Sequence, residues 1–164
     1  MIFVTVGTHE QPFDRLLKCL DKMVEKGQIK EKVIIQKGYS DYEPKYCESY
    51  KLIGYEEMQK YIEEARIIVT HGGPASFIAP LAIGKIPVVV PRKKELNEHV
   101  NNHQVDFSIE VAKRMKNIIV AMNDEEIVDA IINYDKKIKK MNSENNSNNT
   151  IFNEKLMKEI EKII

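Results

Sequence analysis

Short β-branched runs alternate with longer segments of helical periodicity along this chain. Five runs are brief and rich in Val and Ile, as is typical of strands buried on both faces: residues 2–6, 32–36, 66–70, 86–90 and 117–121. A weaker run lies at residues 51–53. Segments 13–24, 56–65, 75–83, 98–115 and 124–134 fit helices. Strands separated by helices pair in parallel, so the pattern predicts an α/β fold, a Rossmann-like parallel sheet with helices on both faces.

Size and charge narrow the class of protein. The chain has 164 residues, of which 43% are hydrophobic, enough for one core of ordinary size. Lys plus Arg equals Asp plus Glu, 25 against 25, so the chain lacks the basic field of nucleic-acid binders and we expect no nucleic-acid partner. Cys19 and Cys47 form no disulfide framework and are read as reduced thiols of a cytoplasmic protein. No apolar run approaches the length of a transmembrane helix.

The chain divides into three parts by composition. Residues 1–141 contain the whole strand–helix alternation and are expected to form one domain. Residues 142–150 are rich in Asn and Ser, which predicts a flexible linker. Residues 151–164 carry an apolar stripe at helical spacing, which predicts an amphipathic helix that docks on this domain or on a partner.

Unusual residues follow the predicted strands, at the edge of the sheet where ligands of such folds bind. The segment from His71 to Ser76 ends a strand, turns at two glycines and starts a helix. Free amides at the start of that helix, with the positive end of its dipole, suit a diphosphate. His71 is expected at the mouth, donating to a phosphate oxygen or packing against a sugar. The alternative is a turn that uses glycine for geometry only.

Several motifs together resemble one family. His71-Gly72-Gly73, then a helix, Gly84-Lys85, an apolar strand closed by Pro91, and Asn102-His103-Gln104 resemble the C-terminal domain of glycosyltransferase family 28. The opening from Val4 to Thr8, with residues 13–16, resembles the single-domain members of that family. That branch includes the catalytic subunit of the eukaryotic dolichol-linked UDP-GlcNAc transferase and bacterial capsular or exopolysaccharide β-1,4-galactosyltransferase subunits. The bacterial branch looks closer, through residues 7–11, 38–42, 71–75 and 98–104.

The resemblance implies the donor-binding half of a GT-B glycosyltransferase, with residues 1–141 as the nucleotide-sugar-binding domain. The implied enzyme is a two-component, inverting hexosyltransferase that moves galactose from UDP-galactose onto a lipid-linked sugar. Its implied partners are a UDP-hexose, the lipid-linked acceptor and a membrane-anchored subunit that carries the acceptor half. The chain is then expected in the cytoplasm, recruited to the inner face of the membrane by that subunit. No cofactor and no metal are expected, because enzymes of this kind neutralise the leaving diphosphate with helix dipoles and hydrogen-bond donors.

The motifs and the resemblance together give candidate site residues. Those expected to contact the UDP-sugar are Gly7, Thr8, His71, Gly72, Gly73, Pro74, Ala75, Ser76, Arg92, Glu98, His99, Asn102, His103 and Gln104. Arg92, just past a strand end, is expected to offset the charge of UDP, and the alternative is a solvated basic loop. His9 and Glu10 are candidate catalytic residues, either as an acid or base or as a diphosphate contact. The alternatives are a purely structural loop end, and a base on the partner chain.

One position departs from the family. Many members carry a glutamate eight residues after the histidine to hold the ribose, whereas this chain has Ala79 there. Glu98 or Gln104 are candidates to replace it.

Three other functions compete with this interpretation. A zinc site at His99 and His103 has the right spacing on a helix, but it would need at least a third ligand and the segment lacks the HExxH order. A non-catalytic UDP-sugar-binding or enhancer subunit has the same binding residues. A different nucleotide-dependent enzyme is disfavoured because both GxGxxG and GxxxxGK[ST] are missing.

Overall fold

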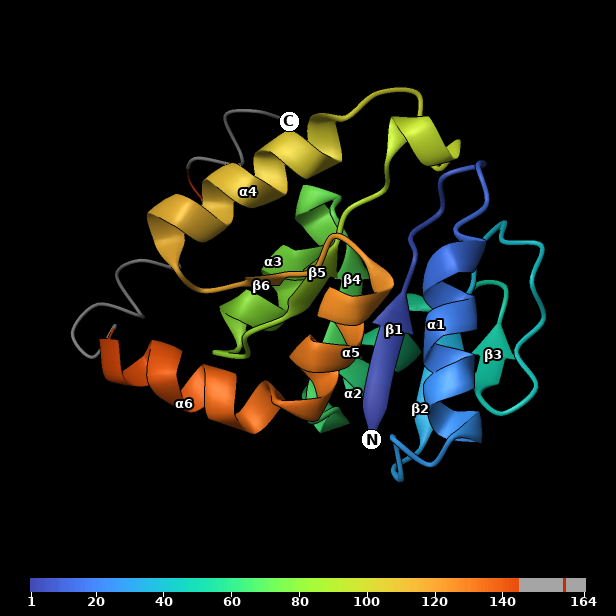
Figure 1. The fold of residues 1–164 in the computed structure, drawn as a ribbon, viewed down its shortest axis with the longest axis horizontal. Coiled ribbons are helices and arrows are strands. Elements are labelled where there is room, and N and C mark those ends of the chain that lie inside the picture. The colour runs from blue at the N-terminus through green and yellow to red at the C-terminus, as the bar shows by residue number, and fades with distance from the viewer. Residues whose placement is uncertain (145–157, 159–164) are drawn as a thin grey trace.

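The computed structural model describes residues 1–144 and 158, and these residues form one parallel sheet with the strand order β3-β2-β1-β4-β5-β6 (Figure 1). The strands are β1 (Ile2–Thr5), β2 (Val33–Gln36), β3 (Glu48–Tyr50), β4 (Ile67–His71), β5 (Val88–Val90) and β6 (Ile119–Val120). Every neighbouring pair is parallel. The predicted Rossmann-like fold is confirmed.

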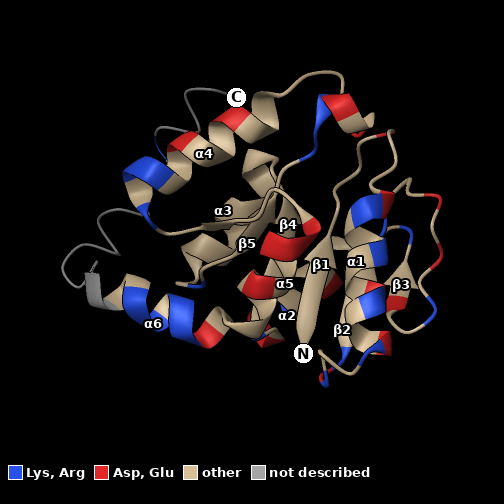
Figure 2. Ribbon diagram, in the orientation of Figure 1, with Lys and Arg blue, Asp and Glu red and all other residues tan. Residues whose placement is uncertain are grey.

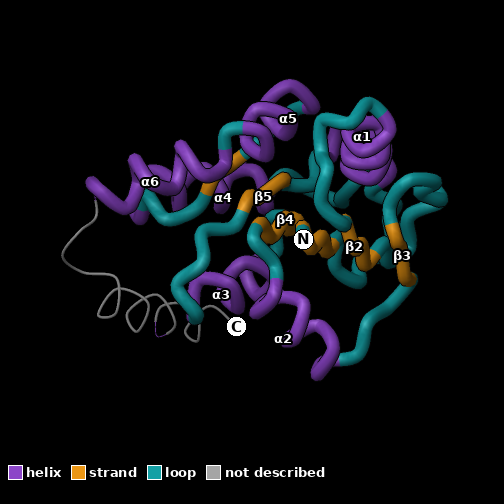
Figure 3. The backbone as a smooth tube through the Cα atoms, turned by 90° about the horizontal axis from the view of Figure 1, so that it is seen from below, coloured by secondary structure: helices purple, strands orange, loops and turns teal. Residues whose placement is uncertain are grey.

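Helices cover both faces of the sheet (Figure 3). They are α1 (Asp14–Glu25), α2 (Tyr55–Glu64), α3 (Pro74–Ala82), α4 (His103–Met115), α5 (Asp124–Ile132) and α6 (Tyr134–Glu144), with a short 3-10 helix, η1 (Lys94–Leu96). Helices α1 and α5 lie on one face, and α2 and α3 lie on the other. Helix α4 packs beside α3 through Phe77 and Val111. No helix within the described ranges has the length and apolar character needed to cross a bilayer.

The core follows the alternation of side chains along the central strands. In β1, Ile2 and Val4 pack with the residues of α1 and α5, while Phe3 packs against Ile62 of α2. All three β1 side chains are fully buried. Successive strand residues point to opposite faces, so a strand covered on both faces must be apolar throughout. The sheet is therefore held rigidly at its centre, where β1 lies beside β4.

Several boundaries differ from the sequence prediction, and the predicted helix 124–134 ends at Ile132 and is followed by a second helix, α6. Strand β3 forms at Glu48–Tyr50, not at residues 51–53, because an edge strand needs no apolar run. Helix α4 begins at His103, with Asn102 as its N-cap, and not at residue 98. Helix α6 reaches Glu144, three residues into the predicted linker. Residues 145–150 and the predicted helix at 151–164, apart from 158, lie outside the described residues.

Both cysteines are free and buried. Burial raises the pKa of Cys19 to about 11, and the pKa of Cys47 to about 12. Both side chains therefore remain neutral thiols at physiological pH, which fits a structural role in the core.

Candidate donor-binding site

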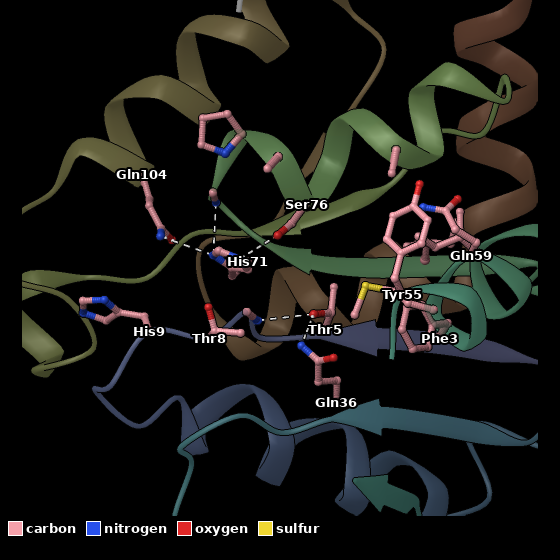
Figure 4. Close-up of a pocket in the computed structure, with 18 of the residues that line it drawn as sticks. Phe3, Thr5, Thr8, His9, Gln36, Tyr55, Gln59, His71, Ser76 and Gln104 are labelled. Atoms are coloured by element: carbon pink, nitrogen blue, oxygen red, sulfur yellow. Dashed lines mark hydrogen bonds between the residues drawn. The ribbon is translucent and has the colours of Figure 1, made fainter. Parts of the chain in front are cut away.

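A pocket opens where the chain leaves β1 and β4. These strands are neighbours, but β1 leads to α1 on one face and β4 leads to α3 on the other. The loops after them diverge and leave a crevice at the carboxyl edge of the sheet. The pocket has a volume of about 780 Å³. Its lining residues are Phe3, Thr5, Gly7, Thr8, His9, Gln36, Tyr55, Met58, Gln59, Ile62, Ile68, His71, Gly73, Pro74, Ala75, Ser76, Ala79, His99 and Gln104 (Figure 4).

His71 lies at the centre of this pocket and is almost entirely buried. Its Nδ1 accepts a hydrogen bond from the Gly73 amide at 3.1 Å and lies 3.3 Å from Nε2 of Gln104. The Gln104 side chain is oriented by its Oε1, which accepts hydrogen bonds from the amides of Gly72 and Arg92. Because Nδ1 accepts, the neutral ring carries its proton on Nε2.

The protonated Nε2 of His71 determines what Ser76 offers to a ligand. Nε2 lies 2.7 Å from Ser76 Oγ. In the tautomer just derived, Nε2 donates and the hydroxyl oxygen accepts, so the Ser76 proton is free to point into the pocket. His71 is therefore a positioning residue beneath Ser76, not a donor at the mouth as the sequence suggested. An oriented hydroxyl donor at the start of a helix suits an anionic oxygen.

The charge state of His71 supports this arrangement. Burial lowers its pKa from the ordinary 6.5 to about 4, and the positive charge of Arg92 acts in the same direction. The ring is consequently neutral at physiological pH, as the tautomer argument requires.

Glycines make room for these side chains. A Cβ on Gly73 would lie 2.3 Å from the His71 ring, and one on Gly7 would lie 2.4 Å from it. Gly7 also has a φ of +75°, which disfavours any other residue. A Cβ on Gly72 would lie 2.8 Å from Cβ of Gln104. The glycines of the turn thus accommodate His71 and Gln104, in addition to any ligand.

Helix α3 directs its amino end into the pocket. Gly73 is its N-cap, Pro74 occupies the first position and Ala75 the second, and no side chain caps this end. Amides in the first turn have no carbonyl partner within a helix, and the helix dipole adds a partial positive charge there. The Ala75 amide and the Ser76 hydroxyl together therefore form an anion site.

The pocket continues from this anion site into an uncharged compartment, with Tyr55 exposed at its rim. Its wall on α2 consists of Tyr55, Met58, Gln59 and Ile62, and α3 contributes Ala79. Helix α3 and the central strands carry no Lys, Arg, Asp or Glu (Figure 2). On its floor, Gln36 donates to Thr5 Oγ1 at 3.3 Å and accepts from the Ile53 amide. A neutral ligand group with one flat, apolar surface fits this compartment.

The opposite end of the pocket carries two stacked histidines. The rings of His9 and His99 are 4.4 Å apart between centroids and inclined by 18°. His9 Nε2 lies 2.9 Å from Gln11 Oε1, and His99 Nδ1 accepts from the Asn101 amide. Thr8 lies beside them and is exposed. Glu10 is exposed but does not line the pocket.

Arg92 is not in the pocket, and this corrects the expectation that it faces UDP. Its guanidinium is fully buried and donates to the carbonyls of Val6, Gln11 and Glu98. It also lies 4.9 Å from the centre of the Phe13 ring. Burial lowers the Arg92 pKa to about 10, so it stays charged at neutral pH. The Arg92 side chain points inward from the strand end and connects the surrounding loops.

Glu98 and Gln104 are both engaged within the protein. The Glu98 carboxylate binds Arg15 at 2.8 Å and accepts from the Lys93 amide, outside the pocket. Gln104 lines the pocket, but its side-chain amide already binds His71 and the backbone amides of Gly72 and Arg92. Neither side chain is placed to hold a ribose, contrary to the sequence expectation, because the scaffold uses their polar atoms.

The remaining predicted residues lie at the edge of α4. Asn102 Oδ1 accepts from the Lys94 amide, and His103 begins α4 outside the pocket. Gly72 is buried behind the turn. Among the residues that the structure describes, no cluster of three or more His, Cys, Asp or Glu side chains is placed to hold a metal ion.

Ten predicted residues converge on the pocket, namely Gly7, Thr8, His9, His71, Gly73, Pro74, Ala75, Ser76, His99 and Gln104. Sequence reasoning missed the α2 wall, especially Tyr55 and Gln59. Their spacing of four residues on one helical face, with Met58 between them, was the available signal. It resembled an ordinary amphipathic helix, so nothing marked it as ligand-facing.

Comparison with known proteins decides the family. The model of the glycosyltransferase family 28 C-terminal domain matches residues 1–162. This chain belongs to the glycosyltransferase family 28 C-terminal domain family. The family resemblance seen in the motifs is thereby confirmed.

Two relatives add context. The human protein named UDP-N-acetylglucosamine transferase subunit ALG13 is 31% identical over 121 residues, which cover 68% of this chain and 10% of that protein. The glycosyltransferase SnogD from Streptomyces nogalater has a similar fold, with a TM-score of 0.53, 14% identity, and coverage of 95% of this chain and 39% of that one. This family 28 domain therefore spans well under half the length of either protein.

Proposed function

We propose that this chain is the donor-binding, catalytic subunit of a UDP-sugar-dependent hexosyltransferase. The observation that carries the proposal is the junction of an anion site with a neutral compartment. The Ala75 amide and the Ser76 hydroxyl bind the diphosphate, and the compartment lined by Tyr55 and Met58 takes the nucleoside. Family membership and the name of the human relative, a UDP-sugar transferase subunit, support this function.

The order of groups across the pocket gives the ligand a direction. Tyr55 and Gln59 lie at the opposite end from His9 and Gln104, with His71 and Ser76 between them (Figure 4). With the diphosphate at Ser76 and the nucleoside beside Tyr55, the hexose lies at the opposite end, beside His9 and His99. His9, with Glu10 nearby in the loop, is our candidate base, and the alternative is a base supplied by the acceptor-binding subunit.

Leaving-group stabilisation follows from the same geometry. When the bond to the sugar breaks, negative charge develops on the diphosphate oxygen. Donors already fixed toward that oxygen stabilise the charge without reorganisation, which is the largest single contribution in many enzymes. The neutral His71 keeps the Ser76 hydroxyl in place for this task. No metal is part of this proposal.

The finer assignment follows the resemblance of the motifs to bacterial surface-polysaccharide enzymes. We propose galactose as the hexose, a β-1,4 linkage, and a lipid-linked sugar as the acceptor in capsule or exopolysaccharide synthesis. A membrane-anchored partner subunit supplies the acceptor site and brings this chain from the cytoplasm to the inner face of the membrane. The subunit character of the human relative supports a divided enzyme.

The test measures binding and transfer with matched serine variants. UDP, UDP-galactose, UDP-GlcNAc and ADP are titrated calorimetrically into wild type, Ser76→Ala and the control Ser49→Ala, which lies on β3 away from the pocket. We expect UDP-sugar binding that weakens about tenfold in S76A and is unchanged in S49A. Sugar transfer to lipid-linked glucose is then measured with and without the partner subunit. A wild-type chain that binds none of the uridine ligands contradicts the proposal, and binding without transfer under any partner condition favours a non-catalytic subunit.

A further inference from the structure

The α2 wall holds an amide side chain that no part of the described protein uses. Gln59 lines the pocket and is half-buried, four residues after Tyr55 on the same face of α2. Its side chain forms no hydrogen bond with any residue that the structure describes. Gln36 and Gln104, the other pocket glutamines, already bind neighbouring groups. Gln59 is therefore available to a ligand in a way that they are not.

The surroundings of Gln59 select the kind of group that it binds. The uncharged compartment is lined by residues that include Met58, Ile62 and Ala79. A charged ligand group placed there would lose part of its hydration without gaining a counter-charge. An amide offers an acceptor oxygen and two donor hydrogens, which matches two adjacent hydroxyls that each donate and accept. A neutral diol satisfies both conditions.

The position of Gln59 relates it to the anion site. In a nucleoside diphosphate the ribose is joined directly to the first phosphate and lies between the phosphates and the base. With phosphates at the amino end of α3 and the base against Tyr55, the ribose passes along the wall where α2 faces Ala79. The side chain of Ala79 has no polar atom that could bind the ribose. Gln59 lines the same part of the pocket and has hydrogen-bonding groups left free by the described residues.

We propose that Gln59 binds the ribose hydroxyls of the donor nucleotide and sets the preference of the pocket for ribonucleotides over deoxyribonucleotides. This inference rests on the proposed donor-binding function. It assigns the discrimination between ribose and deoxyribose to the neutral side-chain amide of Gln59 on α2.

The experiment compares UDP, 2′-deoxy-UDP and 3′-deoxy-UDP by calorimetric titration. The proteins are wild type, Gln59→Ala, Gln59→Glu and the control Gln28→Ala, an exposed glutamine distant in sequence from α2. We expect wild type and Q28A to bind UDP about tenfold more tightly than at least one deoxy analogue. Q59A should lose this tenfold preference by binding UDP more weakly, with little change for that analogue. Q59E keeps an acceptor and should retain part of the preference. Thermal melting establishes that each variant is folded.

The outcomes separate this inference from the function on which it rests. Equal weakening of UDP and both analogues in Q59A would place Gln59 on the base or in the scaffold, and would overturn the inference while leaving the donor site intact. An unchanged preference in Q59A would overturn it as well. Failure of the wild-type chain to bind UDP at all would instead remove the proposed function.

Discussion

His71 stays uncharged well below neutral pH because it is buried. The same burial lowers the stability of the folded protein in acid. Its folded pKa is about 4, against an ordinary value of 6.5. The unfolded chain therefore takes up a proton at this position before the folded chain does. Stability from this group is complete above pH 6.5 and is lost as the pH falls from 6.5 toward 4.

We therefore predict that the fold loses stability in acid with His71 as the main contributor, beside His99, whose pKa is also lowered by burial. Between pH 7.5 and pH 5, His71 should lower the free energy of unfolding by about 2 kcal/mol. Urea unfolding at the two pH values measures this for wild type, for His71→Gln and for His103→Gln, an exposed histidine at the start of α4. H71Q should lose most of the pH dependence and H103Q should keep it. Identical pH slopes in wild type and H71Q would contradict the prediction.

At the scale of single elements, the carboxyl end of α2 is held by a lysine from a distant loop. Lys85 Nζ donates to the carbonyls of Ile62, Glu63 and Ala65. These carbonyls belong to the last turn of α2 and its C-cap, where a helix has no internal donors left. A cation at this end also interacts favourably with the helix dipole. The α2 wall of the pocket is thus fixed from behind.

Replacing Lys85 should weaken the attachment of α2 without creating a cavity in the core. Lys85→Met removes the donor and keeps the aliphatic stem, so we predict a loss of about 1–2 kcal/mol in the free energy of unfolding. The control is Lys60→Met, an exposed lysine on the same helix. Chemical denaturation compares the two variants. Equal stability of K85M and wild type would show that water replaces the ammonium group at no cost.

The elements themselves were largely predictable, and the exceptions have physical causes. The runs around Ile2, Ile67 and Val88 predicted strands because burial on both faces demands apolar residues at every position. Strand β3 escaped this rule because an edge strand needs no apolar run. The inward orientation of Arg92 was also unpredictable, since sequence spacing does not reveal that three backbone carbonyls converge on its guanidinium.

At the scale of the whole molecule, Arg92 joins segments that are far apart in sequence. It follows β5, and its guanidinium binds carbonyls of the loop after β1 and of the segment before α4. These segments surround the pocket, so one buried cation holds the two sides of the site together. The carbonyl partners take over the role that water plays for an exposed guanidinium.

Removal of this cation should therefore weaken the fold and the site together. Arg92→Met removes the donor to three carbonyls, two of them in buried hydrogen bonds, and we predict a loss of about 3 kcal/mol in the free energy of unfolding. UDP affinity should fall as well, because the Gly7 loop and the α4 start lose their common anchor. Denaturation and calorimetry on R92M measure both effects, with Arg114→Met, an exposed residue on α4, as the control. Full stability in R92M would show that the carbonyls find other partners.

The close approach of Gly7 and Gly73 to the ring of His71 also restricts how this family can diverge. A side chain at position 73 is compatible only with a smaller residue at position 71, because the His71 ring fills that space. A side chain gained at position 73 alone should therefore be selected against. Lineages that abandon the histidine are free to lose Gly73, whereas Gly7 is expected to persist because its φ of +75° favours glycine in either case.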